Sequence, residues 1–358
     1  MANSNQQENN SKSTKNFNSI ADIGTERLHE RIRNICLTDA KRDNTSLGGI
    51  DHQTASKWNE TDQTYQLQRS YLFSEGVDYD LAFHPLHHLG YKIGVASVTD
   101  ILSRNGKPEE LAVNIAVPNK ISVEHLEQLL TGLSRFCNTN EISFSTVDVT
   151  ASQQLLLIAT SVTGTASKNH LTSINNANVD DAICITGDIG GAIAGLRVLL
   201  REKKYWEQNQ EEGFQPNLTE YEYVVQKQLL PDARYDFLDL IHSQSITPTA
   251  MYSASDGLIH GLTKIAKSSK AGYYIYQATL PIALPTRQVA DEMGTDVDKY
   301  ALYGGEDYEM IFTMPEDRIE KLKEHFNDYT VIGKVTDQNE GYCMQNAEGD
   351  VVKFEDQK

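Results

Sequence analysis

Carboxylates placed beside glycines at the ends of apolar segments are the residues of this chain best suited to chemistry. The clearest case is Gly304-Gly305-Glu306-Asp307-Tyr308-Glu309, which runs at once into an apolar segment, residues 310–313. Glycines let the backbone turn sharply or lie close to a ligand. Taken alone, the motif is either a solvated turn or a ligand-binding loop at the mouth of a strand, and the rest of the sequence must decide between them.

Two further segments carry an acid at an element boundary. Ser255-Asp256-Gly257 precedes an apolar-periodic segment that predicts a helix from Leu258. Either Ser255 or Asp256 could cap that helix, or Asp256 could bind a metal ion. The second segment, Gly187-Asp188, lies between a predicted strand and a predicted helix, a layout that presents backbone amides to an anion. No Lys-Ser/Thr pair follows it, so the sequence does not indicate a Walker phosphate loop.

Composition narrows the class of protein. The chain has 358 residues, of which 39% are hydrophobic, and a net charge of −18. That charge argues against broad binding to nucleic-acid backbones, although carboxylates can still hold phosphates through divalent cations. We find no apolar run of bilayer length and no signal-peptide pattern, so we expect a cytoplasmic protein that does not bind membranes. The four cysteines are far apart in the sequence and predict no zinc site.

The elements that must position these acids alternate between strands and helices, which predicts an α/β (α+β) fold in two halves that meet near residues 163–180. We expect a disordered tail over residues 1–17, an N-terminal domain over 18–165, a C-terminal domain over 166–340 and a terminal hairpin or tail over 341–358. Alternation over 142–149 places Phe144, Thr146 and Asp148 on one strand face. The polar segment 202–217 predicts an excursion over the surface. Strands are expected at 65–73, 110–117, 142–149, 154–162 and 182–186, and helices at 26–36, 86–103, 122–137, 192–200, 221–229, 234–242 and from 258.

Taken in order, the motifs form a recognisable set. They are Asp51 after Gly-Gly, Glu75-Gly76, Gly90-Tyr91-Lys92 leading to Thr99-Asp100, Asp148, Thr186-Gly187-Asp188, Pro231-x-x-Arg234, Ser255-Asp256-Gly257 and the Gly-Gly-Glu-Asp-Tyr-Glu loop. This set resembles the thiamine-monophosphate kinases, which belong to the superfamily that includes aminoimidazole ribonucleotide synthetase. The resemblance runs from about residue 20 to residue 335 and is most specific in the second half.

The resemblance implies an aminoimidazole ribonucleotide synthetase-like fold with two α/β domains, and a homodimer formed through the N-terminal sheets. It implies transfer of the γ-phosphoryl group of ATP to thiamine monophosphate, with Mg²⁺ held by aspartates. Such in-line transfer needs cations that neutralise and orient the phosphates, and no covalent nucleophile. The residues implied are Asp51, Asp100, Asp148 and Asp256 for metal, Asp256 and Asp148 for catalysis, Asp188, Arg234, Ser255 and Lys92 for ATP, and Glu306, Asp307, Tyr308 and Asp78 for thiamine monophosphate.

The sequence also departs from the family pattern in the first half. The family's Gly-Asp-Asp corresponds to Ile50-Asp51-His52, and its Ser-Thr-Asp corresponds to Arg69-Ser70-Tyr71, so two carboxylates are missing. A Gly-Gly pair before Asp148 is replaced by Thr146-Val147, and a phosphate-binding Arg is missing from residues 174–177. Two hypotheses therefore stay open: a divergent kinase of thiamine monophosphate, or a family member that has lost catalysis and serves as a nucleotide- or thiamine-binding or dimeric scaffold protein.

Overall fold

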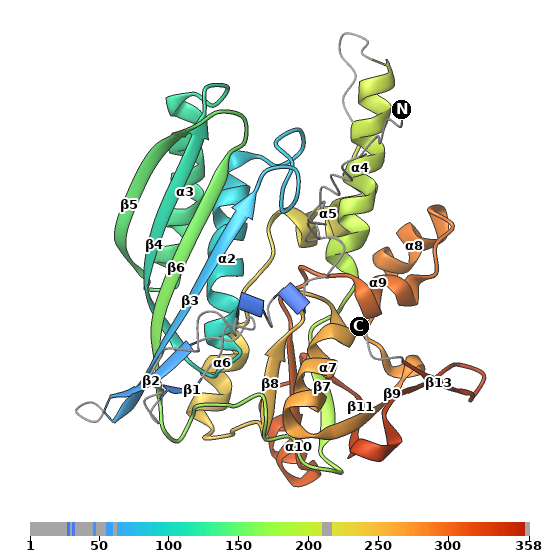
Figure 1. Cartoon of the computed structure of the whole chain (residues 1–358). Coiled ribbons are helices and arrows are strands. Elements are labelled where there is room, and N and C mark those ends of the chain that lie inside the picture. The colour runs from blue at the N-terminus through green and yellow to red at the C-terminus, as the bar shows by residue number, and fades with distance from the viewer. Residues whose placement is uncertain are drawn as a thin grey trace, which may run out of the picture.

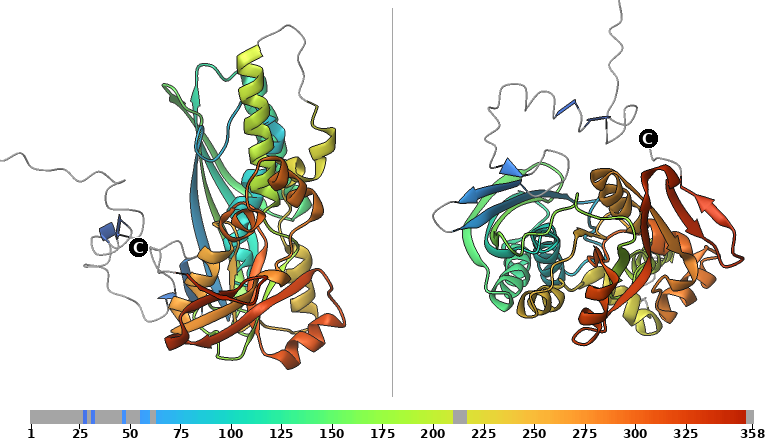
Figure 2. Two further views of the ribbon diagram at one scale, coloured as in Figure 1. Left: turned by 90° about the vertical axis from the view of Figure 1, so that its right-hand side faces the viewer. Right: turned by 90° about the horizontal axis from the view of Figure 1, so that it is seen from below.

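The computed structural model describes residues 27–28, 31–32, 46–47, 55–59, 63–209 and 217–354, with the backbone alone for 46–47 and 55–59. The predicted tail and Asp51 lie outside these residues. Of the helix predicted at 26–36, only four residues are described, and all four are helical. The rest of the chain forms two sheet-based halves that lie side by side (Figure 1 and Figure 2).

The first half is a sheet with the strand order β1-β2-β3-β6-β4-β5 and two helices packed on one of its faces. On β3, Leu67, Arg69, Tyr71 and Phe73 alternate toward the helices, while Leu72 points the other way and is 66% exposed. The elements of the first half are β1 (Ser46–Leu47), β2 (Ala55–Asn59), β3 (Thr64–Ser74), α2 (Leu86–Leu102), β4 (Lys107–Pro118), α3 (Val123–Thr139), β5 (Ser143–Ser152) and β6 (Leu157–Ser167).

The second half is a mixed sheet with the order β13-β12-β9-β11-β7-β10-β8 and helices on both faces. Its elements are β7 (Ala182–Thr186), α4 (Gly191–Asn209), α5 (Glu222–Leu229), α6 (Tyr235–Ser243), β8 (Ala250–Ser253), α7 (Leu258–Ser269), β9 (Ala271–Tyr276), α8 (Leu284–Glu292), α9 (Val297–Tyr303), β10 (Met310–Met314), α10 (Glu316–Lys323), β11 (Tyr329–Asp337), β12 (Tyr342–Gln345) and β13 (Val351–Lys353).

One hydrophobic core joins the two halves. Alternate residues of the second sheet divide between its faces, so that Ile183 and Ile185 pack with α7 while Cys184 packs with α6 and α10. The core on the α6 side is continuous with the core under α2 and α3. The halves therefore pack against each other through a shared core and are not two separate domains joined only by a linker. None of the helices in the described ranges is long and apolar enough to cross a bilayer.

Helix boundaries follow local chemistry in the first half and depart from expectation in the second. Ser122 caps α3 as predicted, since its hydroxyl accepts a hydrogen bond from the backbone N–H of His125. By contrast, α4 continues to Asn209, which corrects the surface excursion expected from residue 202. The residues Arg201-Glu202-Lys203-Lys204 have high helix propensity, so a polar composition there extends the helix instead of ending it. In Figure 1, α4 projects beyond the body of the protein.

A β-bulge in β5 changes which face Asp148 occupies. Leu111 pairs with Phe144 but Ala112 pairs with Thr146, so Ser145 is the extra residue. Beyond the bulge Asp148 pairs with Asn114, on the face turned away from the helices. Phe144 stays on the helix face. This corrects the prediction that Phe144 and Asp148 share a face.

Candidate functional site

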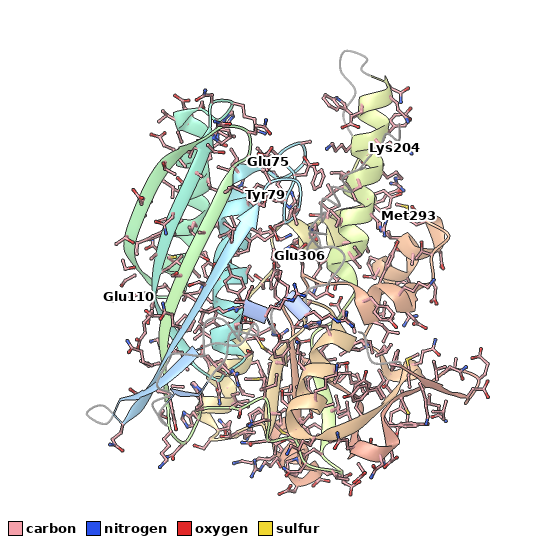
Figure 3. The ribbon with its side chains drawn as sticks, viewed as in Figure 1. Glu75, Tyr79, Glu110, Lys204, Met293 and Glu306 are labelled. Carbon is pink, nitrogen blue, oxygen red and sulfur yellow. The ribbon has the colours of Figure 1, made fainter. Side chains whose placement is uncertain are left out.

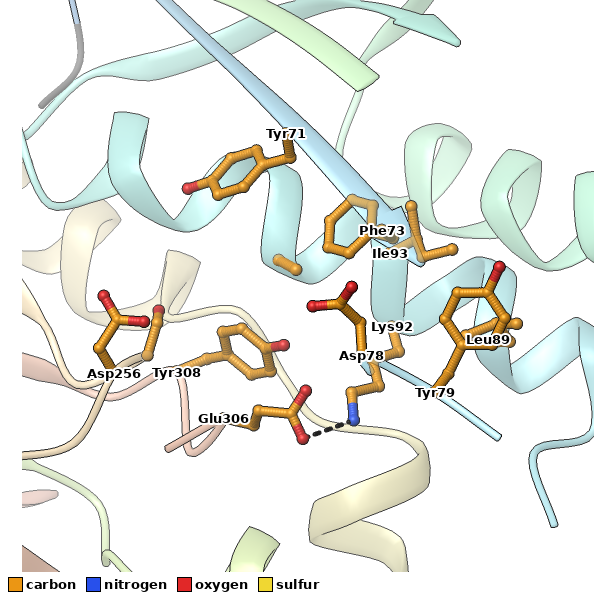
Figure 4. Close-up of a pocket in the computed structure, with 12 residues that line it drawn as sticks. Tyr71, Phe73, Asp78, Tyr79, Leu89, Lys92, Ile93, Asp256, Glu306 and Tyr308 are labelled. Atoms are coloured by element: carbon orange, nitrogen blue, oxygen red, sulfur yellow. Dashed lines mark hydrogen bonds and ion pairs between the residues drawn. The ribbon is translucent and has the colours of Figure 1, made fainter. Parts of the chain in front are cut away.

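The candidate site is a pocket between the two halves (Figure 4). At about 180 Å³ it is smaller than the range of roughly 300–1,000 Å³ usual for ligand pockets, so a ligand as large as a nucleotide would extend beyond it. Strand β3 and helix α2 form one wall, and loops of the second half form the other. The lining residues are Tyr71, Phe73, Asp78, Tyr79, Leu89, Lys92, Ile93, Ala96, Ser255, Asp256, Glu306 and Tyr308.

Six of the residues predicted from the sequence come together in this lining: Asp78, Lys92, Ser255, Asp256, Glu306 and Tyr308. They derive from four separate segments of the chain, and the motif at 304–309 is a loop between α9 and β10 rather than a solvated hairpin. Tyr308 is buried at 5% exposure, and both it and Glu306 have positive φ, +55° and +66°. Non-glycine residues seldom adopt that conformation, and such strain concentrates at functional sites.

Lys92 and Glu306 bridge the two walls of the pocket. Lys92 Nζ lies 3.0 Å from Glu306 Oε2, and Gln228 Nε2 donates a hydrogen bond of 2.9 Å to the same oxygen. Glu306 lies where the halves meet (Figure 3). Asp78, on the loop after β3, is fixed by the backbone N–H of Ser74, and burial raises the pKa of Asp78. The pocket therefore combines one cation, several carboxylates and aromatic rings.

Asp256 is free of a capping role. The N-cap of α7 is Gly257, at φ +96°, and no side chain caps this helix. This corrects the interpretation of Ser255 or Asp256 as its cap. The Asp256 side chain is 60% exposed, and His260 Nε2 lies 3.8 Å from its Oδ2. The hydroxyl of Ser255 instead donates to the hydroxyl of Ser253.

Asp307 has a structural role. Its two carboxylate oxygens accept hydrogen bonds from the backbone N–H groups of Gly190 and Ala192, at the start of α4. Burial raises the pKa of Asp307 to about 7, although these hydrogen bonds act in the opposite direction. Both oxygens therefore bind the start of α4, and Asp307 is not part of the pocket lining, so a contact between Asp307 and the substrate stays a prediction.

Arg234 and Asp188 also have internal partners. Arg234 is buried and pairs with Glu309, Asp328 and Asp236 at 2.7 to 3.1 Å. Asp188 pairs with Lys227 at 3.1 Å and accepts a hydrogen bond from the hydroxyl of Tyr223. Neither residue lines the pocket. Both belong to a charged cluster behind it, and their assignment to ATP stays a prediction.

The metal ligands predicted for Mg²⁺ are not assembled. Asp148 lies on the outer face of the sheet, and the carboxylate of Asp100 is engaged by Arg69 Nε at 2.8 Å. Burial raises the pKa of Asp100, whereas the Arg69 guanidinium favours the carboxylate form. Across the described ranges, no three Asp, Glu, His or Cys side chains converge in a way that could hold a metal ion. Among the predicted ligands within the described ranges, Asp256 is the one that lies in the pocket lining.

Comparisons with a family model and with known proteins all relate this chain to the same family. Residues 69–166 match the family described as AIR synthase related protein, N-terminal domain. The thiamine-monophosphate kinase of Aquifex aeolicus (strain VF5) is 27% identical over 270 residues, which cover 75% of this chain and 81% of that protein. The thiamine-monophosphate kinase of Buchnera aphidicola subsp. Schizaphis graminum is 29% identical over 273 residues, covering 74% and 78%. The resemblance inferred from the motifs is confirmed.

A solved structure gives the same result for the fold. The structure described as AaThiL complexed with AMPPCP and TMP superposes with a TM-score of 0.76, covering 95% of this chain and 97% of that one at 23% identity. Together with the family match over residues 69–166, this superposition confirms the predicted two-domain, aminoimidazole ribonucleotide synthetase-like fold.

The sequence reasoning missed two kinds of residue. Tyr71 and Phe73 line the pocket, whereas the sequence motifs indicate only the loss of a carboxylate at Tyr71. Alternation along β3 could have found both, since they share a face with the buried Leu67. Lys227 and Glu309 form an ion pair in the cluster behind the pocket, with 3.6 Å between Lys227 Nζ and Glu309 Oε1. No local sequence signal predicts this long-range pair.

Proposed function

We propose that this chain, a relative of the thiamine-monophosphate kinases, transfers the γ-phosphoryl group of ATP to the phosphate of thiamine monophosphate and produces thiamine diphosphate. The observation that carries the proposal is the pocket in which Tyr71 and Tyr308 lie near Lys92 and three carboxylates. Similarity to enzymes of that name over about three quarters of the chain supports it.

The pocket chemistry suits a ligand with a cationic ring. The thiazolium ring of thiamine carries a positive charge, and aromatic faces and carboxylates attract such cations. Tyr71, Phe73 and Tyr308 supply the rings, and Asp78 and Glu306 supply negative charge beside them. The phosphate of the same ligand is an anion, and Lys92 is the cation within the pocket lining that can bind it.

In the reaction the acceptor is a phosphate oxygen of the substrate, so the protein needs no nucleophile of its own. Its residues contribute by holding two repelling phosphate groups in line. Lys92 binds and orients phosphate oxygen, and the tyrosine rings fix the ring system. Mg²⁺, when bound, would neutralise phosphate charge. With a single predicted ligand in the pocket lining, the described residues fit a metal carried mainly by phosphate oxygens and do not fit a metal caged by several carboxylates.

The proposal includes a homodimer formed through the first sheet. The face of this sheet opposite α2 and α3 carries no helix among the described elements (Figure 2). Small and polar residues such as Ser70, Ser161 and Thr163 alternate onto it, with the exposed Leu72. A flat face of this kind can pack against a second copy of itself around a two-fold axis.

The direct test is to incubate the protein with ATP, thiamine monophosphate and millimolar Mg²⁺ and to measure thiamine diphosphate by chromatography. The proposal expects product that depends on both substrates and is lost in a Lys92→Met variant. If no thiamine diphosphate forms above the background without protein, the kinase proposal is wrong.

A second candidate, a binding protein that has lost catalysis, is favoured by two observations: Asp100 is paired with Arg69, and Asp148 lies on the sheet face turned away from α2 and α3. If this candidate is right, the protein binds thiamine monophosphate or ATP but does not turn them over. Thiamine monophosphate or ATP would then raise the melting temperature of a chain that makes no product.

A further inference from the structure

The side chain of Asp100 is enclosed by partners from both halves. Arg69 Nε, from β3, lies 2.8 Å from Asp100 Oδ2. The hydroxyl of Ser253, from β8, donates to Asp100 Oδ1 at 3.4 Å. Ser255, in the pocket lining, donates in turn to Ser253. Asp100 therefore lies beneath the pocket and is connected to it through two serine hydroxyls.

The Arg69–Asp100 pair is sheltered from water. The side chains are 16% and 11% exposed, so solvent screens their attraction only weakly. The Arg69 guanidinium also stacks over the ring of Tyr71, at 4.5 Å from its centroid. Removing one member of such a pair leaves a buried charge without compensation, which opposes its exchange for another partner.

The position of Arg69 follows from the sequence. This segment reads Arg69-Ser70-Tyr71. Arg69 and Tyr71 both point toward α2, because residues two apart on a strand share a face. A fixed positive charge therefore lies beside Asp100. The charge of Arg104 acts on Asp100 as well.

We propose that Arg69 is a built-in counter-ion that closes the Asp100 position to divalent cations. A cation approaching Asp100 would meet the repulsion of the guanidinium, which lies 2.8 Å from Asp100 Oδ2 and already occupies that oxygen. Asp100 is then a positioning residue, which holds Arg69 and Ser253 in place. This inference concerns cation binding by the free protein and does not depend on which phosphate ester is the substrate.

The test is titration of the metal-free full chain with Mn²⁺ alone, with free Mn²⁺ followed by electron paramagnetic resonance. Asp100→Asn is expected to leave the Mn²⁺ isotherm of the otherwise unchanged chain as it is. Arg69→Gln is expected to raise Mn²⁺ affinity about tenfold or more, because it removes one unit of repelling charge. The gain is expected to disappear in the Arg69→Gln/Asp100→Asn double variant.

Lys92→Gln is the matched control, since Lys92 is another sheltered cation paired with a carboxylate, Glu306. It is expected to create no Asp100-dependent Mn²⁺ site. The proposal is overturned if Asp100→Asn weakens Mn²⁺ binding in the otherwise unchanged chain, or if folded Arg69→Gln binds Mn²⁺ no better than the parent. Circular dichroism checks folding. Should Arg69→Gln fail to fold, the Asp100→Asn comparison decides alone.

Discussion

Lys92 Nζ lies 3.0 Å from Glu306 Oε2 although 214 positions separate the two residues in the chain. The pair joins α2 of the first half to the loop before β10 in the second. The backbone N–H of Glu306 donates to the carbonyl of Ser255, so this loop is also tied to the segment that carries Asp256. A phosphate that binds Lys92 must therefore compete with Glu306, and the pair links ligand binding to the contact between the halves.

Lys92→Met is expected to lower kcat/KM for thiamine monophosphate by about 10²–10³, the range found when one charged or hydrogen-bonding group that stabilises a transition state is removed. Methionine keeps the apolar stem of the buried side chain, so the fold should survive. Glu306→Gln retains a hydrogen-bonding group but frees the charge of Lys92, and its effect should be below about tenfold. Steady-state kinetics of both variants measures this. Equal losses in the two would contradict a phosphate-binding role for Lys92.

Asp256→Asn separates catalysis from stability. Because no side chain caps α7 and Asp256 is exposed, the substitution should change the free energy of unfolding by less than about 0.5 kcal/mol. If Asp256 acts on the phosphates or their cation, kcat should fall by about 10² or more. Urea unfolding and turnover are measured on the same preparation, with Ser255→Ala as the neighbouring control. A stability loss near 1 kcal/mol with normal turnover would instead indicate a helix cap.

Gly257 lies close to the backbone of Gly304, and its substitution tests the contact between the loops that carry these two glycines. A Cβ at Gly257 would meet the carbonyl oxygen of Gly304 at 3.0 Å, and φ is +96°. Gly349 has φ +93° and no neighbour within 4 Å, so it has a similar positive φ without the contact. We expect Gly257→Ala to cost about 1–3 kcal/mol more than strain alone, because it forces the loops apart. Urea unfolding of the two alanine variants gives the difference, and equal costs would show that the contact is unimportant.

Local patterns predicted much of the fold. The helix at 86–103 and the Ser122 cap could be predicted because periodicity and capping depend on neighbouring residues. The face of Asp148 could not, since one bulge at Ser145 reverses the alternation and bulges have no reliable sequence signal. The same holds for the site: glycine-acid motifs located Asp256 and Glu306, whereas the Arg69–Asp100 pair depends on how two distant elements pack.

Thr163→Arg tests the proposed dimer. Thr163 pairs with Gln68 and Glu110 on the helix-free face of the first sheet, so arginine there would place a bulky charge in the middle of the proposed interface. We expect the parent chain to have the mass of a dimer and the variant that of a monomer, by light scattering after size exclusion. Gln128→Arg, on the exposed side of α3, is the control and should leave the mass unchanged. A parent chain that is monomeric at all concentrations excludes the dimer.

His84 should make the protein sensitive to acid. It is 3% exposed, and burial together with the charge of Lys92 lowers its pKa to about 4. The unfolded chain protonates this imidazole near pH 6.5, so stability from neutral His84 is complete above that pH and is lost as pH falls toward 4. Relative to His84→Gln, the parent chain should lose up to about 3 kcal/mol across this window. Urea unfolding of both proteins at pH 7.5, 6 and 5 isolates the effect, because other titrating groups cancel in the difference. A difference that does not change with pH would mean that His84 takes up its proton equally well in the folded protein.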